Sequence, residues 1–293
     1  MQNKQHLFEP RLVARRRMAA VVSVLFFLAT VFGLLVLLVL MVDVVVKGIG
    51  WLDADFLTNF PSRNPEEAGI KSAIWGSLWM MGLTALMAVP VSVGAALYLT
   101  EYASKNRFYR IVQLNIANLA GVPSVLYGIL GLGLFVRFMA LERSILAGAL
   151  TMTLLIMPVL IISAQEALKA VPSGIRESAY ALGATRSQVI WSHLLPIATP
   201  GIMTGIILSL SRAVGETAPL IMIGALTFIA FLPESVMDPF TVLPIQIFNW
   251  TSRPQAEFQE IAAAAIVVLM VFLFLMNLSA ISLRNYFERN RPY

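Results

Sequence analysis

Five stretches of this chain carry no charged side chain, and each is 22 to 29 residues long: 18–42, 72–100, 111–136, 144–165 and 261–283. A helix rises about 1.5 Å per residue, so about 20 apolar residues cross the roughly 30 Å hydrocarbon layer of a membrane. The five stretches therefore predict five membrane-spanning helices.

One more span, the fifth in chain order, is predicted between residues 194 and 233, which are apolar except for Arg212 and Glu216. Six such segments make the fold class an all-α polytopic membrane protein. The composition excludes a soluble globular enzyme, because 58% of the residues are hydrophobic and only 13% are charged. The chain has no cysteine, which excludes a disulfide framework and thiolate metal sites, and no catalytic or metal-binding constellation is visible.

The basic residues are distributed unevenly and predict the topology. Fourteen of the 21 lie in the tail 1–17, in the loops after the second and fourth spans, and in the tail 284–293, whereas six lie in the other loops. Cytoplasmic segments are rich in Lys and Arg, so both termini are predicted to be cytoplasmic, flanking one membrane domain over 18–283. The first span is too long for a signal peptide and is expected to stay as an anchor. The net charge of +5 is then explained by the topology and does not indicate nucleic-acid binding. The chain is expected to be surrounded by membrane lipid.

The longest polar stretch on the predicted cytoplasmic side is the loop 166–196, whose pattern indicates two short helices. In the first, Ile175, Ala179 and Leu182 are expected to share a face, and Gly183 supplies a left-handed stop. The second begins with a capping box of Thr185 and Gln188 and is expected to end at Pro196. The loop is either an ordinary connector on the membrane surface or a docking element for a cytoplasmic partner.

This loop resembles the E-A-A-x3-G-x9-I-x-L-P loop of ABC importer permeases, from which Ser178 and His193 differ. The resemblance implies that the loop is a coupling loop, which docks into the ATP-binding subunit. A phosphate-binding G-x-x-x-x-G-K-[ST] loop is missing from this sequence, so ATP and Mg would be used by partner subunits and no cofactor by this chain. The residues that match the docking pattern are Glu177, Ala179, Gly183, Leu195 and Pro196.

Two charges inside the fifth span indicate a substrate path. Were that span to begin near Gly201, Arg212 would lie about 17 Å along the axis, with Glu216 one turn later on the same face. An intramembrane charge is costly and most often functional, although the pair could also serve only to lock helix packing. Pro219 and Gly215 are expected to bend or open the helix there, with Ser211 and Thr217 as further hydroxyl donors.

A guanidinium suits an oxyanion cargo, because its planar donors match the geometry of phosphate, but sulfate and molybdate would meet the same donors. The run S-R-A-V-G-E-T-A-P at 211–219 resembles the signature of permease subunits of bacterial phosphate ABC importers. The segments 121–124 (G-V-P-S) and 243–248 (L-P-I-Q-I-F) are also similar to that family, and the short outer loops resemble its PstA type.

The resemblance implies a multi-pass inner-membrane subunit with the type I ABC importer permease fold. The implied partners are a second permease chain (PstC type), a dimer of ATP-binding subunits (PstB type) and a periplasmic phosphate-binding protein (PstS type). By position, the family's transport-linked arginine corresponds to Arg212 and its motif acid to Glu216. The alternatives are an ABC permease for another oxyanion and an ion-gradient-driven transporter in which Glu216 relays protons.

Overall fold

The computed structural model describes residues 9–225 and 228–289. The elements in chain order are α1 (Glu9–Gly48), η1 (Ile49–Trp51), α2 (Ala54–Thr58), η2 (Pro65–Glu67), α3 (Lys71–Leu97), η3 (Tyr98–Tyr102), α4 (Arg107–Ala120), α5 (Ser124–Gly131), η4 (Leu132–Phe138), α6 (Ile145–Lys169), α7 (Ser173–Ala181), α8 (Arg186–Gln188), η5 (Val189–Leu194), α9 (Leu195–Gly215), α10 (Ala218–Ile223), α11 (Leu243–Thr251) and α12 (Ala256–Arg289). The segments η3, η4 and η5 are π-helical.

Five helical segments are long and apolar enough to cross a membrane, and they include α1, α3, α6, α9 and α12. A sixth span is obtained only if α4 and α5 are counted together, although the chain bends by 103° between them. The sequence predicted one continuous helix over 111–136, which is wrong. Pro123 has no N–H group and adopts an extended backbone, so the helix stops at Ala120 and restarts at Ser124.

The start of the fifth span also differs from the expectation. The second short helix of the loop 166–196 was expected to end at Pro196, but it continues into the span as one helix from Arg186 to Gly215. The π-helical turns of η5 come directly before this proline, and their wider winding accommodates a ring that would clash with the Ser192 carbonyl in a regular α-helix. The helix then stops at Gly215, where the sequence placed a bend or opening, so the apolar stretch up to residue 233 is not one continuous helix.

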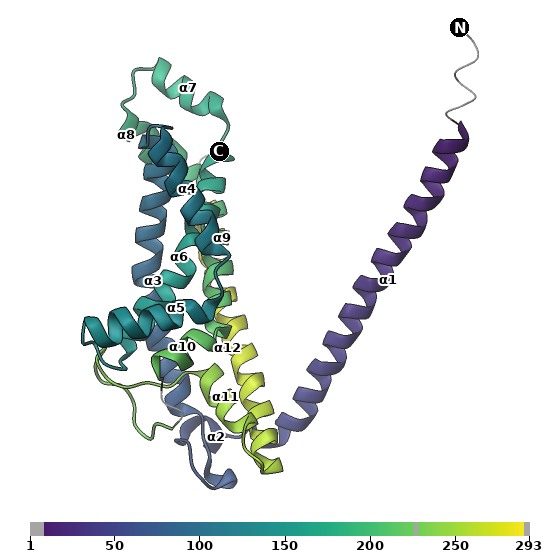
Figure 1. The fold of residues 1–293 in the computed structure, drawn as a ribbon, viewed down its shortest axis with the longest axis vertical. Coiled ribbons are helices and arrows are strands. Elements are labelled where there is room, and N and C mark those ends of the chain that lie inside the picture. The colour runs from purple at the N-terminus through teal and green to yellow at the C-terminus, as the bar shows by residue number, and fades with distance from the viewer. Residues whose placement is uncertain (1–8, 226–227, 290–293) are drawn as a thin grey trace.

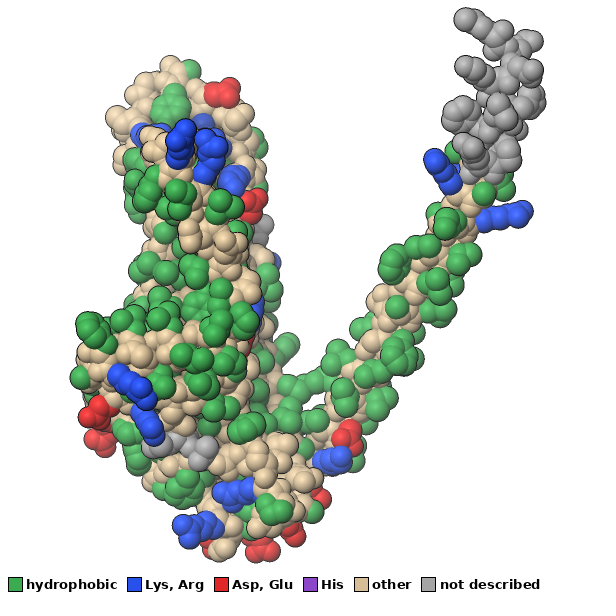
Figure 2. Space-filling view, in the orientation of Figure 1, with side chains coloured by type: hydrophobic (Ala, Val, Ile, Leu, Met, Phe, Trp, Pro, Cys, Tyr) green, Lys and Arg blue, Asp and Glu red, His purple; other side chains and the backbone are tan. Residues whose placement is uncertain are grey.

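The helices α3, α6, α9 and α12 form an elongated body, and α5 lies across it (Figure 1). One end of the body carries α7 and α8; we call residues 173–196 the knob. The opposite end carries α2 and α11, while the start of α1 and the end of α12 lie at the knob end. A broad band of apolar side chains separates the charged residues at the two ends (Figure 2).

Three apolar clusters hold the body together at different heights. The knob end is packed around Leu99, Leu168 and Leu194, the middle around Met152 and Leu220, and the opposite end around Trp250. Helix α1 packs against α12 at its C-terminal end, near Gly48, while the rest of the helix lies away from the body with exposed apolar side chains along most of its length (Figures 1 and 2).

Candidate functional site

Arg212 and Glu216 lie where α9 stops. Arg212 is in the last turn of the helix, and Glu216 follows Gly215 with an extended backbone of φ −78° and ψ 117°. The Nε atom of Arg212 lies 3.3 Å from Oε1 of Glu216, so the two side chains form an ion pair. Because α9 begins at Leu195 and not near Gly201, Arg212 is about 26 Å along the axis from that end rather than 17 Å.

The two members of the pair differ in exposure. The Arg212 side chain is 57% exposed and that of Glu216 only 18%, while the neighbouring Ala213 and Val214 are buried. Among the described residues, the terminal nitrogens Nη1 and Nη2 of Arg212 have no hydrogen-bond partner. A charged side chain within the hydrocarbon layer is costly, and among the described residues Glu216 is the one polar partner found for this guanidinium. A cargo path or a second chain would provide further partners.

The two hydroxyl residues expected beside the pair have different surroundings. The Ser211 hydroxyl lies 2.7 Å from the Ile207 carbonyl and 2.5 Å from Oδ1 of Asn277, so it ties α9 to α12. Thr217 is half-buried and comes directly before α10, where its carbonyl accepts the backbone N–H of Leu220. A role of either hydroxyl toward cargo stays a prediction.

Gly215 and Pro219 flank the interruption of the span. Gly215 is the exposed last residue of α9, and Pro219 is buried in the first turn of α10, where its fixed φ and missing N–H are tolerated. Pro219 also packs against Gly128 of α5, because a Cβ atom on Gly128 would lie 2.6 Å from the Pro219 Cα atom. The interrupted span α9/α10 therefore crosses the interrupted span α4/α5 close to the ion pair.

The Gly128→Ala substitution tests this close approach. The added methyl group would meet the Pro219 backbone, so α5 and α10 must separate, and overpacking of this kind costs about 1–3 kcal/mol. We expect the thermal midpoint of the purified complex to fall by roughly 2–12 °C. Gly133→Ala is the matched control, because a Cβ atom there meets nothing within 4 Å. Equal midpoints for the two variants would show that α5 and α10 accommodate the added methyl group without loss of stability.

The knob has the turn that the sequence predicted. Gly183 adopts φ +82°, and Thr185 and Gln188 form the capping box. Ala179 is buried and Ile175 half-buried, but Leu182 is 89% exposed, so the prediction that it shares their face is wrong. Leu182 follows the last residue of α7, beyond the regular helical face, and points outward. The remaining residues of the docking pattern are the exposed Glu177 and Pro196 and the half-buried Leu195.

Sequence reasoning did not identify two polar contacts between helices. Asn277, which meets Ser211, is the only side-chain amide in the run 261–283, and that isolation was an available signal. The ion pair of Arg176 with Glu101 joins residues 75 apart, and no local pattern predicts it.

Comparison with known proteins gives consistent results. Residues 88–291 match the family described as "Binding-protein-dependent transport system inner membrane component". The chain is 31% identical to the phosphate transport system permease protein PstA 1 of Mycobacterium tuberculosis, over 98% of this chain and 95% of the relative. It is 34% identical to the phosphate transport system permease protein PstA of Mycobacterium leprae, over 92% and 89%. Its fold resembles a chain of a bacterial alginate ABC transporter crystallised with an alginate-bound periplasmic protein, with a TM-score of 0.66, 19% identity and coverage of 92% and 96%.

Proposed function

Because the chain belongs to the family of binding-protein-dependent transport system inner membrane components, we propose that it is the PstA-type permease subunit of an ATP-driven importer of inorganic phosphate. One observation carries this proposal. Two relatives that match over 95% and 89% of their own length are phosphate transport system permease proteins, at 31% and 34% identity. A match that extends over the whole membrane domain favours phosphate over sulfate or molybdate, which the donor chemistry alone does not separate.

The ion pair at the end of α9 supports an oxyanion path. Glu216 engages the Nε atom of Arg212, and no described residue engages the two terminal nitrogens, so these can donate in parallel to two oxygens of one phosphate. The less exposed carboxylate holds the guanidinium in place, and the more exposed guanidinium is accessible from outside this chain. We therefore assign Arg212 as the cargo-facing residue and Glu216 as the residue that orients it.

The exposed surfaces suggest where the partners bind. A second permease chain, of PstC type, would face Arg212 and close the path, and it would share the apolar flank of α1 with membrane lipid. A dimer of ATP-binding subunits would dock at the knob, around Glu177, Ala179, Gly183, Leu195 and Pro196. A periplasmic phosphate-binding protein would deliver cargo at the opposite end, near α2 and α11. The knob end and both termini would then be cytoplasmic, and the chain would be an inner-membrane transporter subunit without its own ATPase site.

The same arrangement suggests how ATP hydrolysis drives transport. The knob continues directly into α9, whose far end carries Arg212 and the break at Gly215. Closure of the ATPase dimer would move the knob, tilt α9 and change the side from which Arg212 is accessible. Interrupted helices around a fixed site are a recurring basis of such alternating access.

Reconstitution of the complete importer tests the proposal. The chain is incorporated in vesicles with its partner subunits, with ATP enclosed and the binding protein and labelled phosphate outside. We expect ATP-dependent uptake that unlabelled phosphate suppresses and that equimolar sulfate or molybdate leaves intact. Suppression by sulfate or molybdate would assign the chain to another oxyanion, and uptake by the isolated chain driven by an ion gradient would contradict an ATP-driven importer.

A further inference from the structure

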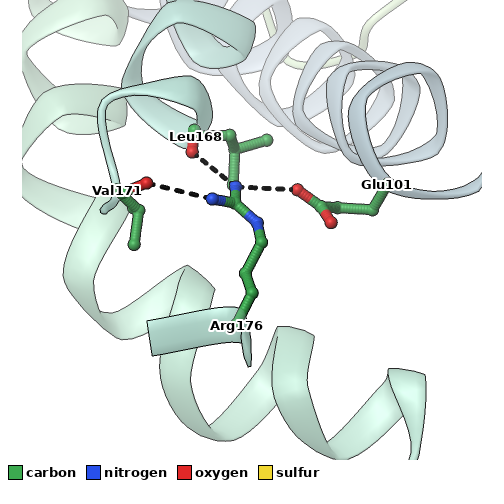
Figure 3. Close-up of polar contacts among 4 residues, drawn as sticks. All are labelled: Glu101, Leu168, Val171 and Arg176. Carbon is green, nitrogen blue, oxygen red and sulfur yellow. Dashed lines mark hydrogen bonds and ion pairs between the residues drawn. The ribbon is translucent and has the colours of Figure 1, made fainter. Parts of the chain in front are cut away.

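Arg176 lies at the point where α7, α6 and the end of α3 meet (Figure 3). Its Nη1 atom donates to the Val171 carbonyl at 2.9 Å, and its Nη2 atom donates to the Leu168 carbonyl at 2.9 Å and to Oε1 of Glu101 at 3.0 Å. The Arg176 side chain is 21% exposed and that of Glu101 only 10%. One guanidinium of the knob thus binds two elements outside the knob.

The two carbonyl groups lie at and just beyond the C-terminal end of α6, because Leu168 is in its last turn and Val171 follows the C-cap residue Ala170. The C-terminal end of a helix carries partial negative charge, so a cation there stabilises it. The three hydrogen bonds are charge-assisted and mostly shielded from solvent, unlike an exposed surface pair such as that of Lys169 with Glu166. Arg176 therefore holds α7 in one position relative to α6.

Glu101 connects Arg176 to a third helix. It belongs to η3, the π-helical continuation of α3, to which the knob has no direct chain connection. The second helix of the knob contacts the same segment, because the Arg186 guanidinium lies 5.1 Å from the centre of the Tyr102 ring. Leu99 of η3 also packs among Ala179 and Leu194 of the knob. Both knob helices are thereby fastened to the end of α3.

Helix α3 extends the connection to the opposite end of the body. It packs along α6, and the Ser77 hydroxyl accepts the backbone N–H of Leu243 at 2.9 Å, at the start of α11. Gly76 directly abuts the backbone of Thr241. A displacement of η3 would therefore be passed along α3 to the segment 241–243.

We propose that Arg176 is a positioning residue that transmits movement of the knob to α3 through Glu101. This route is additional to the chain connections of the knob to α6 and α9, and it rests on the docking role assigned to the knob above. A knob that loses Arg176 would still bind the ATPase through its outer residues but would move α3 less.

A double-mutant cycle in the reconstituted complex tests the proposal. For Arg176→Ala, Glu101→Ala and the double variant, we measure phosphate transported per ATP hydrolysed, together with the ATPase that co-purifies. Coupling free energies between sites correspond to about 5–150-fold, so we expect each single variant to lower the transported phosphate per ATP by at least about fivefold. The double variant should be no worse than either single one, because both remove the same link. The ATPase should still co-purify and hydrolyse ATP.

Two further variants keep the test decisive. Asp43→Ala/Lys47→Ala removes an exposed ion pair on α1, outside the knob and its contacts, and should leave the ratio unchanged. Glu101→Leu keeps the approximate size of the side chain but has no acceptor oxygen, so it decides the matter if Arg176→Ala fails to assemble. A wild-type ratio in Glu101→Leu, or single effects that multiply in the double variant, would overturn the proposal.

Hydrogen exchange separates this inference from the identity of the cargo. In the full complex, Arg176→Ala should raise amide exchange in both α7 and η3 relative to the wild type, whichever oxyanion is carried. Increased exchange in α7 alone would refute the link to α3. Uptake of another oxyanion by a complex with normal Arg176 behaviour would instead overturn only the assignment of phosphate.

Discussion

Arg212→Ala is expected to abolish phosphate uptake in the reconstituted importer while the permease pair and the ATPase subunits still co-purify. The two terminal nitrogens of Arg212 can make two charge-assisted hydrogen bonds to one phosphate, each worth about 1.5–3 kcal/mol. Their joint loss corresponds to a decrease of roughly 10²–10⁴-fold in ATP-dependent uptake at limiting phosphate. Assembly should survive because the Arg212 side chain is 57% exposed and the only hydrogen bond or ion pair found for it among the described residues is with Glu216.

Arg212→Lys and Lys47→Ala serve as comparison variants in the same uptake measurement. A lysine keeps the charge but not the planar fork, so we expect uptake between that of the wild type and that of Arg212→Ala. Lys47 forms an i, i+4 ion pair with Asp43 on α1 and is 56% exposed, so its removal controls for loss of an equally exposed basic side chain that is also paired. Uptake by Arg212→Ala at the wild-type rate would eliminate the oxyanion role of this residue.

The position and composition of the membrane segments could be predicted from the sequence, and an interruption at Gly215 and Pro219 was among the expectations, but the break of the third span at Pro123 was not. Hydropathy reports that a stretch is apolar, whereas Pro123 and Pro219 decide where the backbone hydrogen bonds are interrupted. The motif Gly121-Val122-Pro123-Ser124 is a turn signal inside an apolar run, and it marks the 103° bend. Pro196 shows the opposite case, because the π-helical turns before it let the helix continue.

Some features of the candidate site could likewise be predicted from the sequence, and others could not. The pairing of Arg212 with Glu216 follows from their spacing of four residues, and the turn of the knob follows from the capping box and Gly183. The exposure of Arg212 and its distance from the start of α9 depend on where the helix begins and which face it buries. The contact of Arg176 with Glu101 depends on the packing of distant helices, which local patterns do not encode.

Gly183→Pro is expected to detach the ATPase subunits and to reduce ATP-dependent uptake to background. Gly183 adopts φ +82°, whereas proline is fixed near −65°, so the turn between α7 and α8 cannot form as it stands. The substitution also removes the N–H group that donates to the Tyr180 carbonyl at 2.9 Å. The two knob helices would then lose the relative orientation that presents Glu177 to the ATPase. Co-purification of the ATPase with the tagged permease and uptake into vesicles measure the outcome.

A pair of alanine variants distinguishes the effect of the left-handed backbone of Gly183 from the effect of adding a side chain. At both Gly183 and Gly174 a Cβ atom would meet nothing within 4 Å, but only Gly183 has a positive φ. A left-handed conformation costs a non-glycine residue about 1–2 kcal/mol, so Gly183→Ala should weaken ATPase binding by roughly 5–30-fold if the knob must keep this turn to dock. Gly174→Ala should bind as the wild type does. Equal ATPase affinity for both alanine variants, together with wild-type uptake by Gly183→Pro, would refute the docking role, because the knob would then bind its partner irrespective of the conformation of its turn.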